Sequence, residues 1–382
     1  MSDTDSIAAS LPTVTATPGN GRRPAAHLTP IWRVTVNGNN VSDRILPRFV
    51  SLTITDDRAN DADEVELVVS DHDGRLELPE TGDTVEVAIG WQAEPVAAPY
   101  RQFDSDEMGF PVGLIDKGRY TVQAVEYSGT PDVITIRARA ANLLDSLRGL
   151  RDESWHDTTV GAIVNSVAAR NGIKATVDKE VASRKVKHAD QLSESDASFL
   201  RRLAQTFDCI CTVKNGALLF PQARPRRAPR GKPLPPVFNT RGDGDQHRWS
   251  RADRDAYSGV RAMYNNVKTG NRSSVVAGIS GRAKELRTTF ASEADALAAA
   301  RAEWLRIQRG IFDFEITLAY GRADIIPQRP ARVAGYKRKI DETPWIVTRV
   351  RHSLDGSGYV SQLTLETEQA DGVEGQEGAN AD

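Results

Sequence analysis

The sequence predicts a β-rich α+β protein in which two blocks of antiparallel strands flank a small α+β block. Three observations support this prediction. Apolar and polar residues alternate in short runs near both ends of the chain, turn signals separate these runs, and the middle of the chain changes to a helical period. With 382 residues the chain is long enough for two or three domains.

The first strand block spans residues 30–145. Its alternating runs predict an antiparallel barrel or sandwich. Residues 92–112 break the alternation and are expected to form a long loop. The expected strands are WRVTVNG, FVSLTITDD, DEVELVVSD, DTVEVAIGW, GRYTVQAVEYSG and DVITIRARA. The expected turns lie at Asn37-Gly38, Asp56-Asp57, Asp71–Gly74, Thr81-Gly82 and Ser128-Gly129.

The α+β block spans residues 146–220. The run DTTVGAIVNSVAARNG places apolar residues at helical spacing, with Asp157 or Thr158 as its cap. Asn171-Gly172 supplies a left-handed end to this helix.

A second helix is predicted in SESDASFLRRLAQTF, where Ser193 and Asp196 have the spacing of a capping box. The run CICTVKNGALLF then predicts a hairpin that turns at Asn215-Gly216.

The second strand block spans residues 237–366 and contains one helix, residues 292–309. Ser292 and Asp295 have capping-box spacing at its start, and Gly310 follows its end. The expected strands are SGVRAMYNNV, SSVVAGIS, FDFEITLAYG, RPARVAGY, TPWIVTRVRHSL and GYVSQLTLETE. A second sheet module of the same kind as the first is therefore predicted.

Three segments lack any hydrophobic period. Residues 1–29 predict a flexible N-terminal arm, and residues 367–382 predict a disordered acidic tail. Residues 221–236 form a basic, proline-rich linker that cannot be helical. A solvated linker, or an arm along an acidic neighbour, is favoured over a contact with nucleic acid or membrane. The cations that could contact a partner or nucleic acid are Arg224, Arg226, Arg227, Arg230 and Lys232.

Composition narrows the function classes. The net charge of −3 argues against a dedicated duplex-DNA binder, which would need a strongly basic face. No apolar run is long enough for a membrane span, and the first residues do not resemble a secretory signal. Assembly in a cytoplasm is therefore expected. Cys209 and Cys211, the two cysteines, are expected to be small buried residues that form no disulfide.

Catalytic and metal-binding patterns do not emerge from the sequence. The nucleotide-binding, zinc-protease and serine-hydrolase motifs are absent, and no two of the six histidines have helical i+3 or i+4 spacing. Asp71-His72-Asp73-Gly74 is interpreted as a turn, and Glu194 and Asp196 as carboxylates at a helix start. Arg241–Asp245 is interpreted as a loop without the downstream glutamate of a calcium site. We expect no catalytic residue, metal or cofactor.

The second predicted helix contains the most specific pattern in the chain. The run from Gln191 to Leu203 resembles the Q-x-x-E-S-D-x-x-F-L-x-R-L signature of phage late control gene D proteins. This family comprises baseplate hubs of contractile tails and is related to the hub portion of type VI secretion spike proteins. The matching positions are Gln191, Glu194, Ser195, Asp196, Phe199, Leu200, Arg202 and Leu203.

Two flanking regions strengthen the resemblance. Residues 155–172 resemble the preceding family helix, and residues 345–352 with Gly358-Tyr359 resemble the family's closing hairpin. One departure stands out. The motif helix is followed by Phe207-Asp208, where the family commonly has a small, glycine-containing turn. The geometry of this turn is thus the point at which the chain differs from the family that it resembles.

The resemblance implies two tail-tube-like β-barrel domains joined by the α+β domain, and a homotrimeric ring around a central channel. It also implies a tail tube protein above, a central spike protein below, baseplate wedge proteins around it and a tape measure protein as a further partner. DNA would pass only as transient cargo. The protein would assemble in the host cytoplasm and end in a virion or tailocin baseplate.

Three alternatives remain from the sequence. A type VI-like hub that delivers effectors would be equally structural, although the chain lacks the long repetitive β-helix of a fused spike. A cell-wall hydrolase would need a catalytic acid in a cleft, and an assay on purified cell wall would separate it from a hub. A transcription regulator would need a helix-turn-helix and a basic face.

Overall fold

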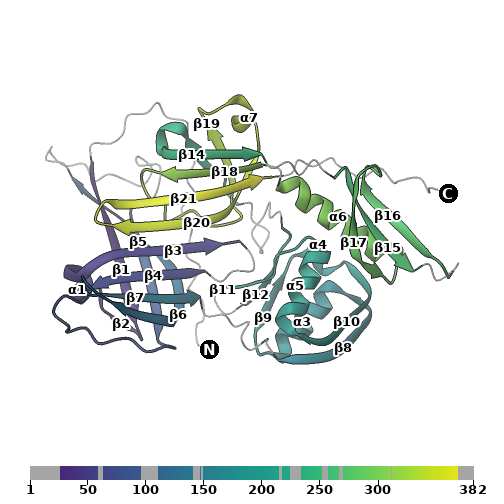
Figure 1. The fold of residues 1–382 in the computed structure, drawn as a ribbon, viewed down its shortest axis with the longest axis horizontal. Coiled ribbons are helices and arrows are strands. Elements are labelled where there is room, and N and C mark those ends of the chain that lie inside the picture. Colours follow the sequence, from purple (N-terminus) through teal and green to yellow (C-terminus); the bar gives the residue numbers. More distant parts are fainter. Residues whose placement is uncertain are drawn as a thin grey trace, which may run out of the picture.

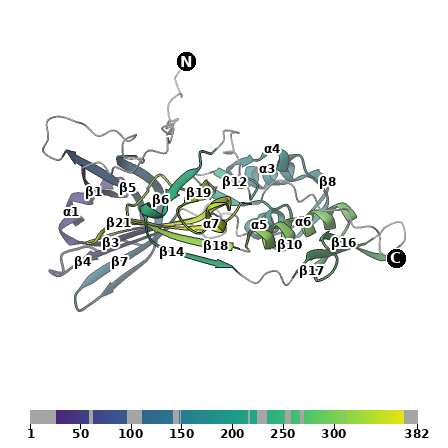
Figure 2. The same cartoon turned by 90° about the horizontal axis from the view of Figure 1, so that it is seen from above.

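The computed structural model describes residues 26–58, 63–95, 111–140, 147, 149–214, 217–223, 234–251, 257–265, 270–310 and 312–368. The fold is β-rich, with helices concentrated in the middle of the chain, as predicted. Figures 1 and 2 both place two strand modules at one end of the molecule and the α+β part at the other. No helix in the described residues is long and apolar enough to cross a bilayer.

The first module confirms the alternating pattern. In β4, Val65, Leu67 and Val69 face a core while the residues between them face outward. Asn37 and Gly38, with φ of 49° and 82°, form the predicted two-residue turn. The strands are β1 (Ala26–Val36), β2 (Asn39–Asn40), β3 (Phe49–Asp57), β4 (Glu64–Ser70), β5 (Thr84–Pro95), β6 (Gly113–Ser128) and β7 (Val133–Ala140). The short helices α1 (Ser42–Ile45) and η1 (Leu46–Arg48) precede β3.

Three local expectations in this module were wrong. Residues 26–29, expected in the flexible arm, belong to β1, and residues 92–95, expected in a loop, belong to β5. Residues 26–29 of β1 pair with residues 92–95 of β5. Each strand is therefore longer than predicted, because its extra residues have a partner in the other strand. Asp56 and Asp57, expected in a turn, end β3. A carboxylate is tolerated there because Lys117 lies beside it.

The second module has its own core, which includes Phe314, Ile316 and Trp345. Strand β20 of this module pairs antiparallel with β3, from Arg349 opposite Asp57 to Asp355 opposite Ser51. Over the residues that the structure describes, thirteen strands thereby form one sheet that contributes to both cores. The module consists of β13 (Val237–Thr240), η3 (Arg241–Asp243), β14 (Gly244–Arg251), β18 (Phe312–Leu318), β19 (Pro330–Ala334), α7 (Arg338–Asp341), β20 (Trp345–Asp355) and β21 (Gly358–Thr367).

Between the modules the chain folds into an α+β domain with a third core. Thr159 caps its first helix in place of Asp157 or Thr158, and Gly172 (φ 68°) ends it in the left-handed conformation, as predicted. Ser195 caps the motif helix in place of Ser193. The elements are β8 (Leu150–Thr159), α3 (Val160–Arg170), β9 (Lys174–Val177), α4 (Lys179–Ala182), β10 (Lys185–Ser195), α5 (Asp196–Thr206), β11 (Thr212–Lys214) and β12 (Ala217–Phe220).

The predicted helix near residue 292 is α6 (Glu293–Arg309), which Ser292 caps as predicted. Strands β15 (Gly259–Asn265), β16 (Arg272–Gly278) and β17 (Ala283–Phe290) pair with each other. In the described residues they do not join the second module, where the sequence placed them. Their apolar face is already covered by the alanine-rich side of α6 in a fourth core. Figure 1 shows this lobe beside α5.

Candidate functional site

The family motif encloses a buried carboxylate. Asp196, the first residue of α5, has a side chain that is only 1% exposed. It accepts hydrogen bonds from Arg170 Nε at 3.0 Å, Asn171 Nδ2 at 2.8 Å and Gln191 Nε2 at 2.8 Å. Burial alone would raise the pKa of Asp196, but these bonds and the guanidinium charge lower it below its usual value. Asp196 is therefore ionised and fixes α3 to α5.

The other polar motif residues complete this arrangement. Gln191 is fully buried, and its Nε2 also donates to the Glu194 carbonyl at 2.9 Å. Ser195 Oγ accepts the Ser198 N–H at 3.2 Å, which caps α5. Arg202 Nη2 donates to Glu194 Oε2 at 2.7 Å. Each polar side chain thus holds the junction between β10 and α5.

The apolar motif residues point into the core of the same domain. Phe199, Leu200 and Leu203 are all at most 5% exposed. Arg202 lies over the Phe199 ring at 5.3 Å from its centroid. The structure therefore brings all eight motif residues together, as one polar junction and one apolar helix side.

A second buried charge cluster lies where the two strand modules meet. Lys117 on β6 and Asp56 on β3 form an ion pair at 2.6 Å, with side chains 3% and 7% exposed. Lys117 Nζ is also 3.1 Å from Nε2 of His352 on β20. Two elements of the first module and one of the second therefore share one buried network.

His352 is held neutral in this network. An ammonium can only donate, so Nε2 accepts from Lys117 and the ring proton lies on Nδ1, 2.7 Å from Ser361 Oγ. Tyr359 Oη lies 3.1 Å from the same Nδ1. Complete burial, followed by the charge of Lys117, lowers the pKa of His352 well below 6.5.

Aromatic packing seals the same junction. Trp91 of the first module stacks on Tyr359 of the second, with ring centroids 5.2 Å apart. Trp91 Nε1 donates to the Gly321 carbonyl at 2.7 Å. A Cβ at Gly321 would lie 2.2 Å from the Tyr359 ring, so only glycine fits.

Sequence reasoning missed this junction. One signal was available, because His352 has the same parity along its strand as the buried residues Val350 and Leu354. Lys117 gave no such signal, since it lies in a polar stretch of β6. Its burial follows from a strand pairing that joins distant parts of the chain.

Two candidate clusters noted in the sequence are structural. Arg48 donates two hydrogen bonds to the carboxylate of Asp73, at 2.6 and 2.5 Å, and Gly74 has a left-handed φ of 64°. The bond from Arg48 lowers the pKa of Asp73 to about 2. Asp243 accepts the Thr240 N–H at 2.7 Å and forms a capping box at η3. Asp71–Gly74 is a turn, as predicted, whereas Arg241–Asp245, expected to be a loop, consists of the 3-10 helix η3 and the start of β14.

The remaining sequence candidates divide into two groups. Cys209 and Cys211 are free thiols, and burial raises the pKa of each to about 12. Over the residues that the structure describes, three or more His, Cys, Asp or Glu side chains do not gather into a potential metal site. The expected partner-contacting cations lie outside the described residues. They are Arg224, Arg226, Arg227, Arg230 and Lys232.

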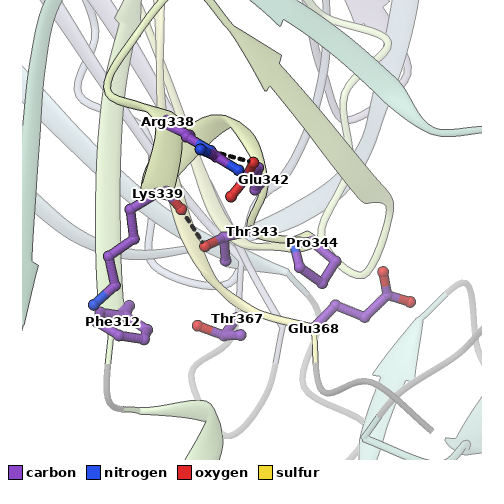
Figure 3. Close-up of a pocket in the computed structure, with 8 residues that line it drawn as sticks. All are labelled: Phe312, Arg338, Lys339, Glu342, Thr343, Pro344, Thr367 and Glu368. Atoms are coloured by element: carbon purple, nitrogen blue, oxygen red, sulfur yellow. Dashed lines mark hydrogen bonds and ion pairs between the residues drawn. The ribbon is translucent and has the colours of Figure 1, made fainter.

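An open hollow of about 550 Å³ lies beside α7 in the second module, and Figure 3 shows the residues that line it. Lys339 and Phe312 both line this hollow, and Lys339 Nζ lies 4.7 Å from the centroid of the Phe312 ring. Arg338 pairs with Glu342 at 2.7 Å, and Thr343 Oγ1 donates to the Lys339 carbonyl. The charged groups drawn here are engaged with their neighbours, and the hollow is typical of a polar protein surface.

Solved structures with this architecture include two tail proteins. The 43 kDa tail protein of prophage MuSo2 from Shewanella oneidensis matches with a TM-score of 0.61 at 15% identity, over 88% of this chain and 98% of that one. A tail protein from Neisseria meningitidis MC58 also matches with a TM-score of 0.61 at 15% identity, over 90% and 97%. This chain therefore shares the fold of these tail proteins.

Sequence relatives define the class further. The family model for the phage tail baseplate hub (GPD) matches residues 64–358. The probable baseplate hub proteins of Escherichia phages 186 and P2 are each 36% identical over 90% of this chain. These matches cover 94% and 95% of the two relatives. The chain belongs to the phage tail baseplate hub (GPD) family, which confirms the motif resemblance.

Proposed function

We propose that this baseplate hub works as a homotrimeric ring that adapts a sixfold tail tube to a threefold central spike. The family and the two curated relatives support the hub role. The ring is supported by one observation above all. Each chain holds two strand modules, with separate cores, joined edge to edge through β3 and β20.

This arrangement suits a symmetry adaptor. Three chains with two modules each present six modules to the tail tube. We propose that each module resembles a tail tube subunit. Closed rings also remove exposed sheet edges, which otherwise invite aggregation. In the described residues the strand path ends at β2 and β14, so these edges are where we expect a neighbouring copy to continue the sheet.

We assign the wall of the channel to the outward face of β3, β4, β6, β7 and β20. A hollow of about 500 Å³ lies on this face. Its charges are paired across strands, for example Arg137 with Glu66 at 2.8 Å and Arg139 with Glu64 at 2.7 Å. Paired charges leave few free cations for phosphates, so DNA could pass without strong binding.

The proposed ring also implies which proteins the hub contacts and where it assembles. The tail tube protein would bind one side of the ring and the central spike the other. Wedge proteins would surround it, and the tape measure protein would contact it during assembly. Assembly would take place in the host cytoplasm and end in the baseplate of the virion or tailocin. The role is structural and not catalytic.

Mass measurement and imaging test this proposal. Native mass spectrometry of the purified full chain should find a particle of three times 41.7 kDa, alone or when tail tube and spike proteins are added. Electron microscopy of that particle should show a ring with a central opening. A chain that stays monomeric in the presence of both partners would overturn the proposal.

A further inference from the structure

The strand ribbon of β8 and β10 carries two exposed histidines that no part of the hub role uses. His156 and His188 are directly opposite each other in the antiparallel register. Their Nδ1 atoms lie 3.1 Å apart, and their ring centroids lie 4.7 Å apart. Trp155 and Ala189, the neighbouring opposed pair, pack against the core, so the histidine face is turned to solvent.

The separation of the two nitrogens fits a shared metal ion. Imidazole nitrogens bind Zn²⁺ at about 2.0–2.1 Å. Two nitrogens 3.1 Å apart would then subtend roughly 100° at the ion, which lies between octahedral and tetrahedral angles. An ion could therefore take the place of the proton between the two nitrogens, which would move to the other ring nitrogen of His156, and neither strand need move.

Asp190 and Ser154 hold His188 in the tautomer that can bind a metal ion through Nδ1. Asp190 Oδ2 lies 2.8 Å from His188 Nε2, and Ser154 Oγ donates to Asp190 Oδ1 at 2.7 Å. The carboxylate can only accept, so the proton of His188 lies on Nε2 and the lone pair of its Nδ1 faces His156. A carboxylate bound to the far nitrogen of a ligating histidine is the usual outer support of protein metal sites.

We propose that His156 and His188 bind one divalent first-row transition-metal ion such as Zn²⁺. Water or a group from another molecule would complete the coordination, since the described residues gather no third ligand here. Further along the same ribbon, Gln191 is opposite Glu153. The ion would thus link the two strands beside the buried charge network of Asp196.

Zinc titration of the untagged, metal-free full chain by calorimetry tests the site. The wild-type chain should bind one ion, and His156→Ala and His188→Ala should each abolish that binding. Asp190→Asn should weaken it by about 10–100-fold, because the outer support is lost. His72→Ala, which removes an exposed histidine elsewhere, should bind as the wild type does.

A second readout separates a specific site from scattered surface binding. Zinc should slow amide hydrogen exchange in β8 and β10 of the wild type and of His72→Ala, because a ligand stabilises the state that it binds. It should have no such effect on His188→Ala. Equal zinc binding by all variants, or no binding by the wild type, would overturn the proposal.

Discussion

At the scale of single residues, the polar side chains of the motif act by providing hydrogen-bond partners for a buried charge. Asp196 receives donors from α3 and β10, and its position as the first residue of α5 adds the favourable end of the helix dipole. Removing one member of such a network leaves the others buried without partners. The motif is therefore explained by folding, and no catalytic role is needed to account for it.

Asp196→Ala should destabilise the α+β domain by about 3 kcal/mol, because Arg170 and Gln191 lose a buried partner. Hydrogen exchange of the full chain should show faster exchange in α3 and α5. Glu64→Ala removes an exposed ion pair with Arg139 and should cost less than about 1 kcal/mol. Equal effects of the two variants would contradict this account.

Because His352 is buried in its neutral form, we expect the folded protein to lose stability in acid. Its folded pKa lies well below 6.5, so below that pH the unfolded chain binds a proton that the folded chain does not. The free energy of unfolding should therefore fall as the pH drops from 7 to 5, by on the order of 2 kcal/mol from this group. Lys117, Asp56, Tyr359 and Ser361 surround the ring, and burial together with the ammonium of Lys117 at Nε2 opposes a second proton.

The variant His352→Gln should flatten that pH dependence, because an amide can accept from Lys117 and donate to Ser361 without titrating. Thermal unfolding at several pH values measures the effect. His72→Gln, an exposed control, should keep the wild-type slope. If His352→Gln unfolds with the wild-type pH dependence, the buried ring is not the group responsible.

At the scale of elements, the departure from the family's turn has a clear structural role. Asp208 adopts a left-handed φ of 52°, the conformation that glycine would usually supply. Its carboxylate forms a two-point ion pair with Arg309 in the last turn of α6, with side chains 13% and 4% exposed. The aspartate thus preserves the turn and attaches the α6 lobe to the motif domain.

Asp208→Asn should loosen the α6 lobe, because asparagine tolerates the left-handed backbone but leaves Arg309 buried without a counter-charge. The expected cost is about 3 kcal/mol, seen as faster hydrogen exchange in α6 and β15–β17. Glu342→Gln breaks an exposed ion pair at the C-terminal end of α7 and serves as the control. Unchanged exchange in α6 of Asp208→Asn would show that the ion pair does not hold the lobe.

At the scale of the whole molecule, four cores are distributed along an elongated chain. The continuous sheet fixes one strand module to the other, because the backbone hydrogen bonds of the antiparallel β3–β20 pairing act together with the buried Lys117 network. The two modules should therefore move as one body. In the proposed ring this rigidity would keep six modules at equal spacing around the channel.

The sequence by itself determined the β-rich class, the motif helix and the family. Alternation and helical spacing report which face of an element is buried, and the motif reports side chains that must meet in one short stretch. The separate sheet of β15–β17 could not be foreseen, because β15 and β16 resemble the other predicted strands and β17 was not predicted as a strand. The pattern of a strand does not specify its partner.

Only the tertiary structure decided which edges meet. The pairing of β3 with β20, the burial of Lys117 beside His352 and the register that places His156 opposite His188 each join residues far apart in the chain. Period-2 patterns are unchanged when a strand is moved to another partner. Partner and register are set by the packing of the complete cores, and this is why they appear only in the folded molecule.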